Sequence, residues 1–192
     1  METSKNGLNL IKSFEGCHLT SYKCPAGVWT IGYGHTQGVT EDQSITQEQA
    51  DLYLKTDLKK FEHYVKAYTS KYSYILNQNQ FDALVSFTYN AGPGNLERRL
   101  LLKGTRPIEL VKFYLPTTCI SAKGKTLPGL VRRRVAEADL MGDCHKDIKI
   151  VAQEVIDGKW GNGQTRKKQL TDVGYDYTLV QEEVNKICQK HI

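Results

Sequence analysis

Residues 14–36 read FEGCHLTSYKCPAGVWTIGYGHT, and the organisation of the chain follows from this stretch outward. From His18 to His35 it is rich in Tyr, Thr, Trp, Val and Ile, and it is interrupted by a Pro-Ala-Gly run and by two further glycines. β-Branched and aromatic residues favour strands, whereas proline and glycine favour turns. The stretch therefore predicts a small twisted sheet of short strands with a tight turn.

Helical patterns lie on both sides of this predicted sheet. The apolar spacing within residues 6–14 predicts a short amphipathic helix. After the sheet, Thr46 and Gln49 form a capping box that starts a longer helix. Further helices are expected over residues 79–90, 107–115 and 128–141. One small early sheet followed mostly by helices indicates an α+β domain.

The end of the chain has the pattern of a separate unit. Gly142 and Asp143 indicate a stop, after which three short amphipathic segments follow. Their sequences are IKIVAQEVIDG, GQTRKKQLTDVG and YTLVQEEVNKICQK. Three such segments predict a small three-helix bundle, a size that is marginally stable alone. We therefore expect two domains, residues 1–143 and residues 144–192.

The composition is that of an ordinary globular protein with a positive charge. Of the 192 residues 40% are hydrophobic, and the formal net charge is +5. No run approaches the ~20 apolar residues of a membrane-spanning helix, so we expect no stable membrane insertion. A positive charge suits any polyanion, but the basic residues lack the spacing of nucleic-acid-binding motifs. We therefore expect no nucleic-acid partner.

The cysteines give no sign of a metal site. They are Cys17, Cys24, Cys119, Cys144 and Cys188. No CxxC pair or His/Cys cluster has the spacing of a zinc site, so we expect no metal. An odd number of scattered cysteines is typical of free thiols made in a reducing compartment. We also expect no organic cofactor.

Glu15 and Thr30 form the first candidate pair for chemistry. Glu15 ends an apolar helix face, and a carboxyl group at a helix–sheet junction is expected to be partly desolvated and to stay protonated near neutral pH. Such a group can donate a proton to a glycosidic oxygen, and a strand threonine facing it can hold the attacking water. On composition alone, a surface glutamate and a sheet threonine are the better interpretation.

The surrounding motifs change that balance, because the chain resembles the phage-type lysozymes (glycoside hydrolase family 24). The family pattern is a glutamate, eight residues, an aspartate or cysteine, five residues and a threonine. In this sequence these positions are Glu15, Cys24 and Thr30, within FEG, YKCPAG and TIGYGHT. The resemblance continues through NQNQFDALVSFTYNAGPG and LPGLVRRRVAEADL and covers roughly residues 6–141.

The resemblance implies hydrolysis of the β-1,4 bond between N-acetylmuramic acid and N-acetylglucosamine, with inversion. Glu15 would be the general acid, Cys24 would sit beside the attacking water, and Thr30 would orient that water. An inverting geometry leaves roughly 6.5–9.5 Å between the acid and the opposing group. Cysteine is a permitted variant at the second position, but only a thiolate could act as a base. Both roles for Cys24 stay open, as a thiolate base and as a spacer for the water.

The resemblance also implies roles for residues around the catalytic positions. His35 and Asp57 are expected to form a buried contact between the sheet and the long helix, with a structural role. Asn90 is expected to line the sugar cleft. One of the three arginines in RRR is expected to approach Glu15, and the other two are expected to be solvated. These arginines are Arg132, Arg133 and Arg134.

Cys17 and Cys24 could form a regulatory disulfide. They are seven residues apart, and Cys17 lies two residues from Glu15. A bond between them would block the catalytic position under oxidising conditions. Two unlinked thiols are the favoured interpretation for protein kept in a reducing cytosol.

The tail resembles the CW-seven cell-wall-binding repeat of some phage lysins, through VIDGKWGNG, RKKQL, GYDY and VQEEVN. This resemblance implies binding to peptidoglycan. Aromatic rings stack on sugars, and a guanidinium binds carboxylates in paired contacts. For Trp160 and Tyr175 a place in the core of the bundle is the favoured interpretation, whereas Arg166 is the better candidate for ligand contact.

The leading interpretation is a lysozyme-like muramidase domain followed by a wall-binding module, with bacterial peptidoglycan as the partner. The alternatives are a catalytically impaired peptidoglycan-binding protein, which cysteine at position 24 keeps open, and a lytic transglycosylase. The N-terminus METSKNGLNLIKSFEG does not have the pattern of a secretion signal. We therefore expect a protein that is made in the cytoplasm and reaches the wall after release through a partner such as a phage holin. We also expect a monomer.

Overall fold

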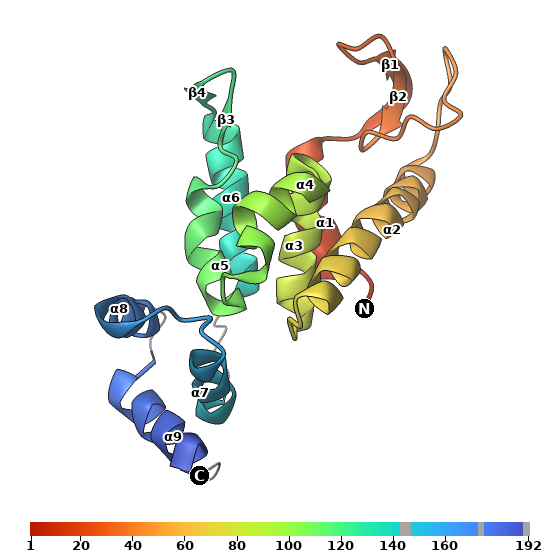
Figure 1. The fold of residues 1–192 in the computed structure, drawn as a ribbon. Helices are drawn as coiled ribbons and strands as arrows, with labels where there is room; N and C mark the ends of the chain where they lie inside the picture. The colour runs from red at the N-terminus through yellow and green to blue at the C-terminus, as the bar shows by residue number, and fades with distance from the viewer. Residues whose placement is uncertain (143–146, 173–174, 190–192) are drawn as a thin grey trace.

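The computed structural model describes residues 1–142, 147–172 and 175–189 and shows a mostly helical molecule (Figure 1). Helix α1 (Lys5–Glu15) leads into an antiparallel hairpin of strands β1 (His18–Lys23) and β2 (Trp29–Gly32). In this hairpin Tyr22 lies opposite Thr30. The small early sheet predicted from the Tyr- and Thr-rich stretch is therefore confirmed.

Five helices follow the hairpin in the first part of the chain. They are α2 Gln47–Lys71, α3 Gln78–Ala91, α4 Pro93–Asn95, α5 Ile108–Tyr114 and α6 Pro128–Met141. The predicted capping box of Thr46 and Gln49 begins α2, and a second box, of Asn77 and Gln80, begins α3. The predicted α+β class, a small early sheet followed mostly by helices, is confirmed.

Several short elements were not predicted from the sequence. They are the π-helix η1 Leu96–Leu100, the 3-10 turns η2 Leu102–Gly104 and η3 Leu115–Thr117, and the hairpin of β3 Ser121–Ala122 and β4 Lys125–Thr126. All of them lie between α4 and α6, where the chain makes the return path that places α6 beside α3. Figure 1 shows the β3–β4 hairpin at the start of α6.

Helix α3 is the centre of the larger hydrophobic core. All of residues 80–88 are buried, so no side of this stretch faces solvent. A helix that is buried on all sides must have neighbours around it, and α3 packs against α1, α2 and α6. Figure 1 shows α3 between α2 and α6. This packing brings the polar side chains of α3 and α6 together beside the end of α1.

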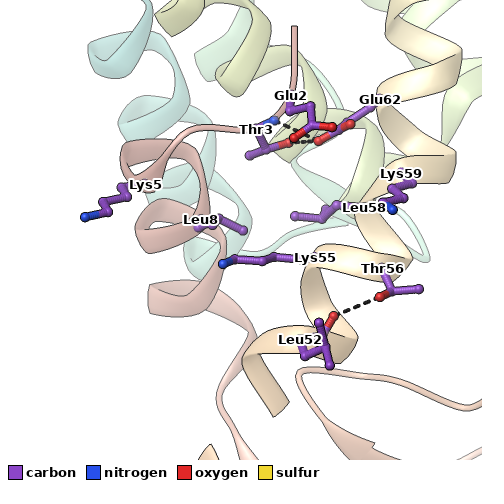
Figure 2. A pocket seen from close by; sticks show the side chains of 10 residues that line it. All are labelled: Glu2, Thr3, Lys5, Leu8, Leu52, Lys55, Thr56, Leu58, Lys59 and Glu62. Carbon is purple, nitrogen blue, oxygen red and sulfur yellow. Dashed lines mark hydrogen bonds between the residues drawn. The ribbon is translucent and has the colours of Figure 1, made fainter. Parts of the chain in front are cut away.

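The residues before α1 are tied to α2 and α3. The backbone N–H and the hydroxyl of Thr3 both donate to Glu62 Oε1 at 2.7 Å (Figure 2). The backbone N–H of Ser4 donates to Asp82 Oδ1 at 3.0 Å, and the Ser4 hydroxyl contacts the other oxygen of that carboxylate. The Ser4 hydroxyl also caps α1 by accepting from the backbone N–H of Asn6. The start of α1 is thus fixed by two buried carboxylates, and its far end carries Glu15.

The C-terminal part forms the predicted three-helix bundle, of α7 Ile148–Ile156, α8 Gly163–Asp172 and α9 Tyr177–Gln189. It has a second hydrophobic cluster that is separate from the first and includes Trp160. Among the described residues, Leu110 of α5 is the one member of this cluster that comes from the first part of the chain, and it is 5% exposed. The expected domain boundary, at residues 143 and 144, lies outside the described residues, and so does Cys144.

Candidate functional site

Glu15 lies at the end of α1, where Gly16 turns the chain towards β1. Gly16 has a φ of 69°, in the left-handed region that glycine adopts without strain. The side chain of Glu15 is 24% exposed, and Arg133 Nη1 forms an ion pair with its Oε1. Arg133 comes from α6 and is only 3% exposed. Glu15 is therefore partly desolvated, as expected, and a buried guanidinium lies against its carboxyl group.

Cys24, in the turn between β1 and β2, lies next to Thr30 of β2. The Cys24 N–H donates to the Val28 carbonyl at 3.0 Å, and the Thr30 hydroxyl donates to the same carbonyl oxygen at 3.0 Å. Backbone hydrogen bonds of Val28 and then Ala26 lower the pKa of the Cys24 thiol, and the Thr30 side chain acts in the same direction. The lone pairs of the Thr30 oxygen can accept a hydrogen bond from a water molecule.

Arg133 is the arginine that approaches Glu15, and Arg132 is exposed as expected. The expectation that both other arginines are solvated is wrong for Arg134, which is 0% exposed. The reason is that Arg134 points into the space between α6 and α3, where its Nη2 donates to Asn90 Oδ1 at 2.9 Å. Asn90 itself is exposed at the end of α3. Its Oδ1 is held by Arg134, which leaves the Nδ2 group oriented for another acceptor.

The structure brings His35 and Asp57 together, as the resemblance implies. His35 Nδ1 lies 2.9 Å from Asp57 Oδ2, and Nε2 lies 2.9 Å from the Gln37 carbonyl oxygen. The His35 ring stacks on Tyr53 at 4.4 Å between ring centroids. These contacts join the segment after β2 to helix α2. They favour the structural role expected for this contact.

The cysteines of the described residues are free thiols. Cys17 is exposed, Cys24 is half-buried, and neither has a covalent partner in this structure. Cys119 packs against the larger core, and burial raises the pKa of its thiol. The redox-dependent disulfide between Cys17 and Cys24 stays a prediction.

In the C-terminal bundle, Trp160 and Tyr175 are core residues. Trp160 is 0% exposed and Tyr175 is 6% exposed, and their rings meet edge to face at 6.0 Å. Arg166 is half-buried: its Nε donates to the Gly161 carbonyl at 3.2 Å, and its Nη1 donates to Gln181 Oε1 at 3.4 Å. Arg166 is thus oriented by the bundle, and it remains the candidate for ligand contact.

Sequence reasoning missed three polar residues behind Glu15. Ser86 and Tyr89 lie on α3 and Glu137 lies on α6. Ser86 and Glu137 are 0% exposed, and the Tyr89 hydroxyl donates to the Tyr33 carbonyl at 2.7 Å. The available signal was the spacing of Arg133 and Arg134 to Glu137, because residues three and four apart share a helix face. That spacing predicts a helical ion pair but gives no indication that the pair is buried.

A cavity of about 400 Å³ between α1 and α2 is separate from this site (Figure 2). Its apolar side chains include Leu8 and Leu58, and Lys5, Lys55 and Lys59 surround it. None of the predicted catalytic residues lines it. The Glu15–Arg133 pair and the turn that holds Cys24 therefore stand as the candidate active site, and the cavity does not contribute to it.

Two kinds of feature are absent from the parts of the chain that the structure describes. No three His, Cys, Asp or Glu side chains gather there as a metal site requires. None of the helices in those parts combines the length and apolar character needed to cross a membrane.

Comparison with known proteins gives two family matches. Residues 12–137 match the phage lysozyme family, and residues 149–188 match the CW_7 repeat. The endolysin of Acyrthosiphon pisum secondary endosymbiont phage 1 is 36% identical over 147 residues, which cover 73% of this chain and 97% of that protein. The endolysin of Lactococcus phage c2 is 43% identical over 149 residues, again 73% of this chain, but the match spans only 60% of that longer protein.

Solved structures give the same assignment. The muramidase domain of SpmX from Asticaccaulis excentricus has a TM-score of 0.63 and 35% identity, with 73% of this chain and 97% of that chain covered. The active form of P1 phage endolysin Lyz has a TM-score of 0.62 and 28% identity, with 73% and 85% covered. Both resemblances inferred from the sequence motifs are therefore confirmed. The chain belongs to the phage lysozyme family, and its C-terminal part carries a CW_7 repeat.

Proposed function

We propose that this endolysin-type peptidoglycan hydrolase is a muramidase, which cleaves the β-1,4 bond between N-acetylmuramic acid and N-acetylglucosamine. One observation carries the proposal. In a chain of the phage lysozyme family, Glu15 is held by a buried arginine at the end of α1, and the hairpin that follows places Cys24 of its turn next to Thr30 of β2. A proton donor and a water-binding group are the two parts that glycoside hydrolysis needs.

Glu15 is the general acid in this proposal. It donates its proton to the glycosidic oxygen as the bond to the anomeric carbon breaks. A water molecule attacks that carbon from the opposite face, so the configuration inverts. Thr30 accepts one proton of this water in a hydrogen bond and so orients it. The Cys24 thiolate takes up the other proton of the water, and Arg133 stabilises the Glu15 carboxylate that results.

The lowered pKa of Cys24 supports the base role over that of a spacer. A neutral thiol is a poor base, so the fraction of thiolate at a given pH sets how much enzyme is competent. Backbone N–H groups in a tight turn stabilise a thiolate without a cationic neighbour. Hydrogen bonds to the charged form are one of the three physical causes that shift a pKa in a protein.

The CW_7 repeat retains the enzyme on the wall, with Arg166 as the contact residue. A guanidinium suits the carboxylates of peptidoglycan stem peptides, since it can bind them in paired contacts. One repeat alone binds weakly, so the catalytic cleft supplies a second point of attachment that raises the overall affinity. We further propose that the protein acts as a monomer and reaches the wall through a holin.

Clearance of a purified peptidoglycan suspension tests the proposal. The intact protein should clear it, and Glu15→Gln should reduce clearance by a factor of 100 or more, on the order expected for loss of a general acid. Glu41→Gln removes an exposed carboxylate that is not one of the predicted catalytic residues and is the matched control.

The products identify the reaction. Reducing muramic acid ends indicate hydrolysis, whereas anhydro ends, which are lighter by one water, indicate a lytic transglycosylase. If neither protein clears the suspension, with or without reductant, the chain is a peptidoglycan-binding protein and the muramidase proposal is wrong.

A further inference from the structure

Behind the candidate site lies a carboxylate that the proposed reaction does not use. Glu137 of α6 is 0% exposed, and its Oε1 accepts three hydrogen bonds. The donors are Ser86 Oγ at 2.7 Å, Arg134 Nη2 at 3.1 Å and Arg133 Nε at 3.2 Å. Arg134 Nε also lies 3.0 Å from the other oxygen of the carboxylate. Burying a carboxylate here costs desolvation free energy, which apolar residues of similar volume at this position of the helix would avoid.

The guanidinium of Arg133 joins this buried carboxylate to the site. Its Nε binds Glu137, its Nη1 binds Glu15, and its Nη2 donates to the Ser86 carbonyl at 3.3 Å. A guanidinium is planar and its donors are fixed in direction. Contacts on three nitrogens therefore hold the plane of Arg133 in one orientation, with one edge on each carboxylate.

We propose that Glu137 is a positioning residue for the reaction: it aims Arg133 at Glu15 and shares its positive charge, so that Glu15 can hold its proton until the glycosidic oxygen is in place. The inference rests on the proposed role of Glu15 as general acid. An arginine paired with Glu15 alone would stabilise the carboxylate and oppose proton donation. A second carboxylate on the same guanidinium reduces that effect and adds a negative charge that disfavours ionisation of Glu15.

The charge state of Glu137 is set by its surroundings. Burial raises the pKa of Glu137, and Arg134 and Arg133 oppose that shift, with a hydrogen bond from Ser86 acting in the same sense as the arginines. With two guanidinium groups and a hydroxyl donating to a single oxygen, the ionised form is the one that the geometry favours. Its charge then offsets that of the arginines within a space closed to solvent.

Other titratable groups face this cluster and belong in any account of its pH dependence. On α3, Tyr89 lies within electrostatic range of Glu15 and Arg133, and burial raises the pKa of its hydroxyl. Tyr22 of β1 and Asp57 of α2 act on the same tyrosine. Cys119 acts on Arg134 from the segment after η3. All of them are present unchanged in the variants below, so they do not alter the comparison.

The pH profile of peptidoglycan clearance tests the proposal with full-length protein. In Glu137→Gln, turnover should fall, and the alkaline limb of the profile should move to lower pH by about one unit, because Arg133 then acts on Glu15 alone. Half-saturation by peptidoglycan should stay close to that of the intact protein, since Glu137 does not reach the substrate. Asp139→Asn removes an exposed carboxylate from the same helix and should leave the profile unchanged.

Glu137→Asp separates the orientation of Arg133 from the negative charge at position 137. It also provides the test if Glu137→Gln does not fold. It keeps the negative charge but is one methylene shorter, so it should slow turnover without moving the alkaline limb. An unmoved limb in folded Glu137→Gln, or full turnover in Glu137→Asp, overturns the positioning role. Glu15→Gln is assayed beside these variants. If Glu15→Gln still clears peptidoglycan, the proposed role of Glu15 as general acid is wrong. If Glu15→Gln is inactive but the Glu137 variants behave like the intact protein, only the positioning role of Glu137 is wrong.

Discussion

At the scale of single residues, Cys24 occupies the position where the family pattern permits an aspartate or a cysteine. The thiol has no charged partner among the causes of its lowered pKa, which are backbone hydrogen bonds and one hydroxyl. The turn itself therefore supplies the stabilisation of the thiolate. A change that leaves the turn intact but removes the hydroxyl should raise the pKa only in part.

Alkylation of Cys24 tests this directly. Because its pKa lies below that of an ordinary thiol, Cys24 should be modified by iodoacetamide at a pH where a free cysteine is still largely protonated and slow to react. In Thr30→Val the onset should move to higher pH but should stay below that of free cysteine, since Val28 and Ala26 still contribute. The rate is read by mass spectrometry of the Cys24 peptide. An onset that does not move in Thr30→Val would show that the hydroxyl does not contact the thiol.

The same measurement decides the disulfide hypothesis. After mild oxidation, a bond between Cys17 and Cys24 would make both thiols unreactive and would stop peptidoglycan clearance until reductant is added. In Cys17→Ser, oxidation should then leave clearance intact. Two reactive thiols and equal clearance with and without reductant would end the hypothesis.

At the scale of elements, helix α1 is fixed at its start and carries Glu15 at its end. Gly7 is buried against Asp82, and a Cβ added at Gly7 would lie 2.8 Å from Asp82 Cβ and Cγ and from Thr3 Cγ2. Contacts this short require the backbone of α1 to move. The N-terminal hydrogen bonds to Asp82 and Glu62 would then be strained, and Glu15 would shift with the helix.

Gly7→Ala should therefore destabilise the protein although alanine is the better helix former. Helix propensity favours the substitution by about 1 kcal/mol, but overpacking costs about 1–3 kcal/mol. We expect a net loss of about 1 kcal/mol in the free energy of unfolding, measured with denaturant. Gly129→Ala in α6 is the control, because a Cβ there meets only Arg132 Nη2 at 4.0 Å. Equal stability of the two variants would contradict the close packing of α1 on α3.

The elements also show what a sequence can predict. Helices α2 and α3 begin at capping boxes, and a local hydrogen-bond pattern of this kind is readable from four residues. The segment between α4 and α6 is different. Leu102, Lys103, Cys119 and Lys123 have positive φ there without being glycine. Tertiary contacts hold such conformations, so propensity gives no indication of them.

The same distinction holds in the site. Glu15 and Thr30 sit in a motif with fixed spacing, whereas the role of Ser86 and Glu137 depends on α3 and α6 packing face to face. The burial of Arg134 was mispredicted for the same reason. Three consecutive arginines suggest a solvated surface, and only the packing of α6 shows that two of them are inside.

At the scale of the whole molecule, Leu110 connects the two hydrophobic clusters. It belongs to α5, but it is buried with Trp160 and the other apolar residues of the C-terminal bundle. Two cavities border this junction, one beside Ile75 and Ile150 and one beside Phe113 and Gln169. Leu110 is thus a buried apolar contact between the two parts.

Leu110→Ala should uncouple the two parts on heating. Loss of a buried leucine side chain costs about 2 kcal/mol or more, and here the loss falls on the smaller bundle. In a Trp29→Phe background, Trp160 is the remaining tryptophan and reports on the bundle, while circular dichroism reports on all helices. In Leu110→Ala we expect the Trp160 fluorescence to change at a lower temperature than the circular dichroism signal. In the protein that keeps Leu110, both signals should change at the same temperature.

Leu52→Ala is the control for this comparison. Leu52 is 61% exposed, so its truncation should change the transition little. Coincident transitions in Leu110→Ala would show that the two parts are joined by something other than this side chain.

The C-terminal bundle packs on the first part of the chain through Leu110. This contact limits the distance between a site bound by the bundle and the bonds that the enzyme can cut. In the proposed function, while the CW_7 repeat stays attached to one site on the wall, the catalytic residues can reach only the glycan strands within that distance. Further progress then depends on dissociation and reattachment, so the release rate of the repeat limits how fast an insoluble wall is dissolved. If the single repeat binds weakly, as proposed above, it is suited to that task, because a tighter anchor would leave the enzyme beside bonds it has already cut.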